Sequence, residues 1–203
     1  MKKQFIFTFV LMIAMLFSAC SPAKTADKAA ENNTGAYVAT DITGAEFAKA
    51  LSLTDHTGKR RTLNDFKGKV VALFFGYTHC PDVCPTTMFD LKNAMKLLGD
   101  KSNQVQVLFV TVDPQRDTQE VLAQFVPAFD KSFIGLRGSL QETAETLGSF
   151  KVFYSKIEGK NKDDYTVDHS AGIYVFDKKG SVRLYMNYGE KSADMASDFS
   201  KLM

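Results

Sequence analysis

A short apolar run followed closely by two cysteines constrains this chain more than any other feature. Residues 70–75 read Val-Val-Ala-Leu-Phe-Phe, and Gly76, a loop and helix-forming sequence follow them. An apolar run of this length bounded by turn residues predicts a buried strand. In open α/β sheets, ligands bind just beyond the carboxyl ends of such strands. Cys80 and Cys84 come next in the chain, so the sequence predicts a functional site there.

Pro85 predicts where the following helix begins. Proline disfavours helical angles in the residue before it and suits the first helical position. We therefore expect Cys84 just before the helix and Cys80 in the loop. Unpaired amide groups at that helix start would favour a thiolate over a thiol.

Length and composition fit one globular domain with a substantial core. The chain has 203 residues, of which 45% are hydrophobic, and only three cysteines, too few for a disulfide-stabilised miniature fold. Its formal charge is +2, and two leader lysines account for that excess, because the other 23 basic residues match the 23 acidic ones. Bulk charge therefore predicts no nucleic-acid partner.

Residues 1–19 have the pattern of an export signal. Two lysines are followed by an apolar stretch and then by small residues before Cys20. A cysteine at this position resembles a bacterial lipoprotein signal, in which cleavage leaves Cys20 as the lipid-bearing first residue. The alternative is an uncleaved anchor, although about 18 apolar residues are usually needed to span a bilayer. Either interpretation predicts an extracytoplasmic domain attached to a bacterial membrane, where a cysteine pair can be stored as a disulfide.

The composition then divides the chain into a tether and a domain. Residues 20–45 are rich in Ala, Lys, Asn, Thr and Asp and poor in large apolar residues, which predicts a flexible tether. Residues 46–203 carry the regular hydrophobic patterns of a folded domain.

Those patterns predict strands and helices in alternation. A short hairpin near residues 51–58 precedes the strand at 70–75 and a helix at 86–98. A strand at 105–112 leads to a helix capped by Asp117, and a second capping signature at Ser139 starts another helix. A hairpin of residues 173–176 and 182–188 and a last helix close the chain.

Strand, helix, strand, helix, hairpin and helix is the order of a thioredoxin-like α/β fold. We expect a central mixed sheet flanked by helices on both faces, with residues 133–167 as an insertion before the C-terminal hairpin. The cysteine spacing differs from that of thioredoxins, because three residues separate Cys80 from Cys84 instead of two.

His169 is the third candidate site residue. It comes directly before the strand at 173–176, and in thioredoxin-like folds the loop before that strand lies beside the active-site loop. Oxidoreductases carry a cis-proline at this place, whereas this chain offers an imidazole. Two thiolates and one imidazole suit copper(I), copper(II) or zinc, and they exclude metals that prefer carboxylates, such as magnesium and calcium.

Other candidate ligands have simpler interpretations. His79 could be a ligand, but backbone alternation points it away from Cys80, and His56 is expected to be solvated in a turn. Met88 and Met95 lie on the apolar face of a helix and are expected to pack in the core. Two charged segments are expected to be solvated surface: residues 59–61 and 160–164.

Three motifs together resemble the Sco/SenC family, the copper-assembly factors of cytochrome c oxidase. They are Gly-Tyr-Thr-His-Cys-Pro-Asp-Val-Cys-Pro-Thr-Thr at residues 76–87, Thr-Val-Asp-Pro-Gln-Arg-Asp at 111–117 and Asp-His-Ser at 168–170. The resemblance covers residue 50 to the C-terminus.

The resemblance implies a thioredoxin fold that binds one copper ion, as copper(I) or copper(II), through Cys80, Cys84 and His169. It also implies a role in building the dinuclear copper centre on oxidase subunit II, by copper delivery, by reduction of the target's cysteines, or by both. The implied partners are subunit II and an upstream periplasmic copper donor.

Three classes of function fit the residues. A metallochaperone is favoured by the cysteine spacing and by His169, and a thiol-disulfide oxidoreductase is favoured by the fold and the compartment. A peroxidase of the peroxiredoxin type shares the fold and the insertion, but such enzymes lack a proximal cysteine pair plus histidine.

Overall fold

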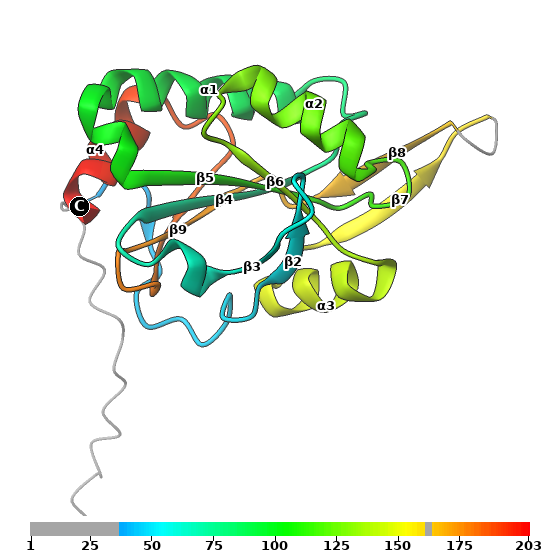
Figure 1. Cartoon of the computed structure of the whole chain (residues 1–203), viewed down its shortest axis with the longest axis horizontal. Helices are drawn as coiled ribbons and strands as arrows, with labels where there is room; N and C mark the ends of the chain where they lie inside the picture. The colour runs from blue at the N-terminus through cyan, green and yellow to red at the C-terminus, as the bar shows by residue number, and fades with distance from the viewer. Residues whose placement is uncertain (1–36, 161–163) are drawn as a thin grey trace, which may run out of the picture. The chain divides into compact units, whose positions relative to one another are not determined.

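The computed structural model describes residues 37–160 and 164–203 (Figure 1). The predicted signal peptide, the lipid attachment at Cys20 and most of the predicted tether lie outside the described residues. In the part that is described, no helix is long and apolar enough to cross a membrane.

The domain is built on an eight-stranded sheet with the strand order β1-β10-β9-β4-β5-β6-β2-β3. β4, β5 and β6 are parallel, and the other pairings are antiparallel, so the sheet is mixed. Its strands are β1 (Thr40–Asp41), β2 (Ser52–Asp55), β3 (Arg60–Thr62), β4 (Val70–Gly76), β5 (Val105–Thr111), β6 (Ile134–Arg137), β9 (Ile173–Phe176) and β10 (Val182–Met186). A separate two-stranded hairpin is formed by β7 (Tyr154–Glu158) and β8 (Tyr165–His169).

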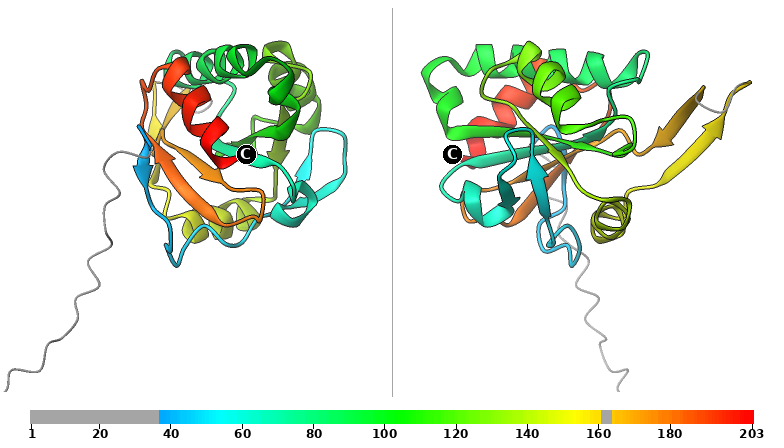
Figure 2. Two further views of the ribbon diagram at one scale, coloured as in Figure 1. Left: turned by 90° about the vertical axis from the view of Figure 1, so that its left-hand side faces the viewer. Right: turned by 45° about the vertical axis from the view of Figure 1, so that its right-hand side comes forward.

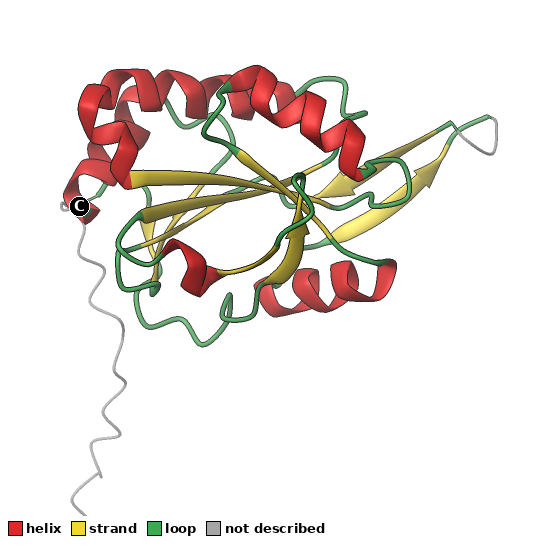
Figure 3. Cartoon of the chain, viewed as in Figure 1, coloured by secondary structure: helices red, strands yellow, loops and turns green. Residues whose placement is uncertain are grey.

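Helices cover both faces of this sheet. α1, α2 and α4 lie on one face and α3 lies on the other (Figures 1 and 3). The four α-helices are α1 (Val83–Leu98), α2 (Gln119–Phe129), α3 (Leu140–Phe150) and α4 (Ser192–Leu202), and two short 3₁₀ helices span Leu63–Phe66 and Gly99–Gln104. Every residue of β4 and β5 is buried, as expected for central parallel strands covered on both sides.

The predicted thioredoxin-like α/β architecture is confirmed, including the mixed sheet and the helices on both faces. The segment predicted as an insertion, residues 133–167, is only partly one. Its first strand, β6, pairs with β5 inside the main sheet, and only the β7–β8 hairpin projects from the domain (Figure 2). β6 has four residues, including a glycine, which is too short for a periodicity signal.

The folded domain begins before residue 46, where the sequence places its start. β1 pairs with β10, and the amides of Val38 and Ala39 donate hydrogen bonds to the fully buried Asp198 carboxylate. Residues 38–41 therefore belong to the folded domain, a part of it that the sequence does not reveal because the strand has only two residues.

Two residues expected at the solvated surface, His56 and Arg61, are instead partly buried. His56 is partly buried, and its Nδ1 accepts a hydrogen bond from the Gly135 amide at 3.0 Å, so it links the β2–β3 turn to β6. In the basic segment at 59–61, Arg61 pairs with the buried carboxylate of Asp55 at 2.7 Å. That carboxylate requires a partner for its charge once it leaves water.

Glu190 should make the stability of the domain depend on pH. Burial, aided by the nearby carboxylates of Asp198 and Asp194, raises the pKa of Glu190 from 4.5 to about 7. One of its carboxylate oxygens is buried without a hydrogen-bond partner among the described residues. The folded state therefore prefers the protonated acid, so this contribution to stability is present below pH 4.5 and is lost as the pH rises through about 7.

Glu190→Gln should remove this loss. We expect the melting temperature of the variant to exceed that of the wild type at pH 8 and to equal it near pH 4.5, measured by circular dichroism. The same temperature difference at both pH values would show that Glu190 does not titrate in this way.

Candidate metal centre

The site begins where two buried parallel strands end together. Gly76 of β4 lies opposite Thr111 of β5, and the amide of Val112 donates to the Gly76 carbonyl at 2.8 Å. A side chain at position 76 would meet the rings of Phe109 and Phe74 at 2.8 and 2.9 Å and the sulfur of Cys84 at 3.1 Å. Only glycine lets the chain leave the sheet here with the cysteine sulfur packed against it.

Cys84 lies inside the first turn of α1, with its side chain fully buried. The expected position just before the helix is therefore wrong by two residues. Pro85 is tolerated inside the first turn because the amide that it lacks would have no partner within the helix. Cys80 lies in the preceding loop as predicted, partly exposed, and its sulfur accepts a hydrogen bond from the Cys84 amide at 3.4 Å.

His169 ends β8 and faces Cys84 across the site. Its Nε2 lies 3.6 Å from the Cys84 sulfur, although 85 residues separate the two in sequence. Its Nδ1 lies 3.0 Å from the carbonyl oxygen of Ser170, which can only accept, so the Nδ1 proton is used there. This hydrogen bond leaves the Nε2 lone pair directed at Cys84, just as metal-binding histidines donate their other ring N–H to a carbonyl or carboxylate.

Cys84 lies next to each of the other two predicted ligands, Cys80 and His169. Within residues 37–160 and 164–203, no three His, Cys, Asp or Glu side chains already surround one point as the ligands of a metal ion would. Cys80 and His169 both line a groove of about 400 Å³, with Pro81, Val83 and Phe153 among its apolar walls. The exposed side of the site is therefore open to a partner.

The two thiols differ strongly in acidity. The hydrogen bond with the Cys84 thiol, assisted by nearby amides and by His169, lowers the pKa of Cys80 from 9.0 to about 5 despite partial burial. The same contact and deep burial raise the pKa of Cys84. The amides at the helix start therefore favour a thiolate, as expected, but at Cys80 and not at Cys84, because the amide of Cys84 points at the sulfur of Cys80.

Asp117, predicted as a helix cap, has a different role. Its buried carboxylate accepts hydrogen bonds from the Thr78 amide at 3.0 Å, from the Thr78 hydroxyl at 2.6 Å and from the Thr111 hydroxyl. Burial raises the pKa of this carboxyl. The cap of α2 is Thr118, whose hydroxyl accepts from the Val121 amide. Asp117 instead fastens the cysteine loop to the end of β5.

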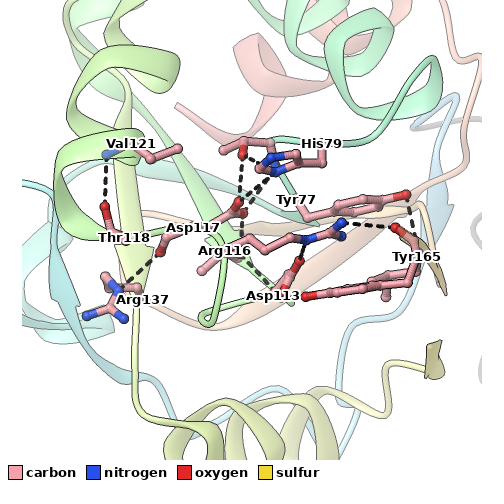
Figure 4. A network of polar contacts seen from close by, with 12 residues as sticks. Tyr77, His79, Asp113, Arg116, Asp117, Thr118, Val121, Arg137 and Tyr165 are labelled. Atoms are coloured by element: carbon pink, nitrogen blue, oxygen red, sulfur yellow. Dashed lines mark hydrogen bonds and ion pairs between the residues drawn. The ribbon is translucent and has the colours of Figure 1, made fainter. Parts of the chain in front are cut away.

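The remaining candidate ligands do not join Cys80, Cys84 and His169. His79 is 53% exposed and turns its Nδ1 toward Asp117 at 3.7 Å (Figure 4). Met88 and Met95 are buried in the core, as predicted. Tyr77 was not identified from the sequence, yet its ring packs edge-on against His169, with the ring centroids 6.0 Å apart. Its only signal is an aromatic residue directly after the glycine that ends β4.

Comparisons with known proteins agree with this architecture. The SCO1/SenC family model matches residues 39–203. The mitochondrial SCO2 homolog of Bos taurus is 39% identical over 150 residues, which are 73% of this chain and 56% of that protein. The chain therefore spans little more than half of this relative.

Solved structures with the same fold include two at 37% identity. Copper-bound ScoI of Bradyrhizobium japonicum superposes with a TM-score of 0.70, covering 75% of this chain and 96% of that one. The apo Sco1 protein of Thermus thermophilus gives a TM-score of 0.68 over 80% of this chain and 99% of that one.

The fold and the site together define a thioredoxin-like protein with two cysteines and a histidine at the end of its central parallel strands. With the family model matching most of its length, the chain belongs to the SCO1/SenC family. The resemblance inferred from the three sequence motifs is thereby confirmed.

Cys80 should react with alkylating reagents well before Cys84 in the reduced, metal-free protein. Cys80 is partly exposed and has a pKa of about 5, whereas Cys84 has no exposed surface. Mass spectrometry after timed iodoacetamide treatment should show Cys80 fully modified first, with a rate that falls only as the pH drops through about 5. A midpoint near 9.0, the ordinary thiol value, would contradict this assignment.

Gly76→Ala should disturb the site through packing. The added methyl group would press on two buried rings and on the Cys84 sulfur, so we expect a loss of about 1–3 kcal/mol in unfolding free energy. Gly148→Ala in α3 is the matched control, because nothing lies within 4 Å of its added methyl group. Equal stabilities of the two variants in urea denaturation would argue against the tight approach at Gly76.

Proposed function

We propose that this protein is a copper metallochaperone that binds one copper ion through Cys80, Cys84 and His169 and helps to assemble the dinuclear copper centre of cytochrome c oxidase. The observation that carries the proposal is the approach of His169 Nε2 to the Cys84 sulfur, at 3.6 Å, beside the sulfur of Cys80. The Sco family is a family of cytochrome c oxidase assembly proteins, and the similar ScoI of Bradyrhizobium japonicum has copper bound.

The donor set fits copper in both oxidation states. Thiolate sulfur stabilises copper(I), and imidazole nitrogen is acceptable to copper(II). The Nδ1 hydrogen bond to Ser170 leaves Nε2 available as the nitrogen donor. The thiols must lose their protons to bind the metal, and Cys80 requires the smaller change because its pKa is already low.

The open groove supports transfer by ligand exchange. Cys80 is partly exposed beside it, whereas Cys84 is buried behind. An incoming thiolate of the partner would reach the copper from the groove and replace the protein's ligands one at a time. Copper is the cargo in this scheme and passes between docked proteins without release into solvent.

The same proposal includes an extracytoplasmic location. Cleavage after residue 19 would leave Cys20 as a lipid-bearing residue on a bacterial membrane, and the tether would let the domain reach subunit II of the oxidase while raising its local concentration there. An upstream periplasmic donor would supply the copper.

A second candidate function is reduction of the cysteines of the oxidase copper site. The acidic, partly exposed thiol of Cys80 next to the buried thiol of Cys84 supports it, because an attacking thiolate beside a resolving thiol is the arrangement of thiol-disulfide oxidoreductases. The two functions make different demands on His169, since only copper(II) binding requires its imidazole.

His169→Ala should separate the two functions. The variant should fold, keep thiol-disulfide exchange and bind copper(I) through its two thiolates, but lose stable copper(II) binding, measured by electron paramagnetic resonance and metal content. His79→Ala is the matched control, because His79 faces Asp117 and should leave copper binding unchanged. Stable copper(II) binding in His169→Ala, with loss in His79→Ala, would overturn the ligand assignment.

A further inference from the structure

The β7–β8 hairpin carries His169 but receives no strand pairing from the main sheet. Its two strands pair only with each other, and the hairpin projects from the domain (Figures 1 and 2). An isolated two-stranded hairpin is marginally stable in water. The position of His169 must therefore depend on side-chain contacts between β8 and the rest of the domain.

One face of β8 makes those contacts. Tyr165, Val167 and His169 alternate along the strand, so their side chains point to the same side. The Val167 amide donates to the hydroxyl of the buried Tyr77 at 3.3 Å, and the Tyr77 ring lies edge-on to the His169 ring. Tyr165, Val167 and His169 thus lie on the strand face that packs toward Tyr77 and the rest of the domain.

Three residues, which we call the hairpin clamp, fix Tyr165 to the β5–α2 loop: Asp113, Arg116 and Tyr165. The Arg116 guanidinium lies 3.5 Å from the Tyr165 ring centroid and donates from Nη1 to the Tyr165 carbonyl at 3.0 Å. The Tyr165 hydroxyl donates to Asp113 at 2.9 Å, and Arg116 Nε donates to the same carboxylate (Figure 4).

The buried geometry of this arrangement favours arginine over lysine at position 116. The Arg116 side chain is 19% exposed and that of Asp113 is 5% exposed. A planar guanidinium can lie flat on the ring while it donates from its edge in fixed directions, whereas an ammonium group has no planar face to stack. Loss of Arg116 would leave the Asp113 carboxylate buried without its charged partner.

We propose that the Asp113–Arg116–Tyr165 clamp positions His169 against Cys84, so that Arg116 controls whether the protein holds copper(II) although it contacts no ligand atom. The effect on copper rests on the proposed metallochaperone function, whereas the positioning of His169 does not. Without the clamp, Cys80 and Cys84 still bind copper(I), since neither thiol lies on the hairpin.

The test compares Arg116→Met with Arg137→Met. Arg137 donates to the backbone of the same β5–α2 loop, at Asp117 and Pro114, from the side away from the hairpin (Figure 4). Arg116→Met should weaken copper(II) binding by about 10–100-fold, as much as the loss of a hydrogen-bond partner of a metal ligand does, and leave copper(I) affinity unchanged. Arg137→Met should leave both affinities near those of the wild type.

A second measurement, on the metal-free protein, tests the position of His169 directly. In the apo protein, nuclear Overhauser contacts between the Tyr77 and His169 rings should be present in the wild type and lost in Arg116→Met. If Arg116→Met fails to fold, Tyr165→Leu removes the ring and hydroxyl from the partly buried edge of the hairpin and should give the same two losses.

The possible results distinguish failure of the clamp proposal from failure of the proposed metallochaperone function. Retained ring contacts and copper(II) affinity in Arg116→Met would overturn the clamp, as would an equal loss of both in Arg137→Met. A wild type that holds no copper(II) would overturn the metallochaperone function, while loss of the ring contacts only in Arg116→Met would still support the positioning role.

Discussion

The site depends on one buried carboxylate. Asp117 has no exposed side-chain surface and satisfies its oxygens with the amide and hydroxyl of Thr78 and the hydroxyl of Thr111. A carboxylate taken out of water requires such donors, so the loop that begins at Thr78 cannot leave the end of β5 without a large free-energy cost. Because Cys80 lies two residues further along this loop, the carboxylate fixes where the cysteine pair stands relative to the sheet.

The cysteines and the histidine of the site are held in place by different kinds of contact. The cysteines are placed by the parallel strands β4 and β5, by the close packing at Gly76 and by the first turn of α1, all deep in the core. His169 is placed by a hairpin outside the main sheet, through an aromatic contact at the base of the hairpin and a stacked arginine near its turn. A dithiol joined to a separately supported imidazole fits the proposed role of a carrier that holds copper in two oxidation states and then releases it.

The sequence predicted the elements that have strong local signals. The apolar runs and capping patterns located β4, β5 and the helices, and the cysteine spacing with one well-placed histidine gave the candidate ligands. The sequence does not reveal β6 or the β7–β8 hairpin, because strands of four or five residues that include exposed or small side chains show no clear hydrophobic period. Asp117 fits the sequence pattern of a helix cap, and only the fold shows that its carboxylate instead accepts hydrogen bonds from Thr78. Arg116 and Tyr165 are 49 residues apart, and only the tertiary structure shows that they stack.

The copper ligands are tested most directly by X-ray absorption at the copper edge of the purified protein loaded with one equivalent of copper(II). We expect a copper shell of two sulfur ligands and one imidazole nitrogen from the protein, with the imidazole scattering absent from the His169→Ala protein loaded with copper(I). A shell without sulfur, or one whose imidazole contribution persists after removal of His169, would contradict the assignment of Cys80, Cys84 and His169 as the copper ligands.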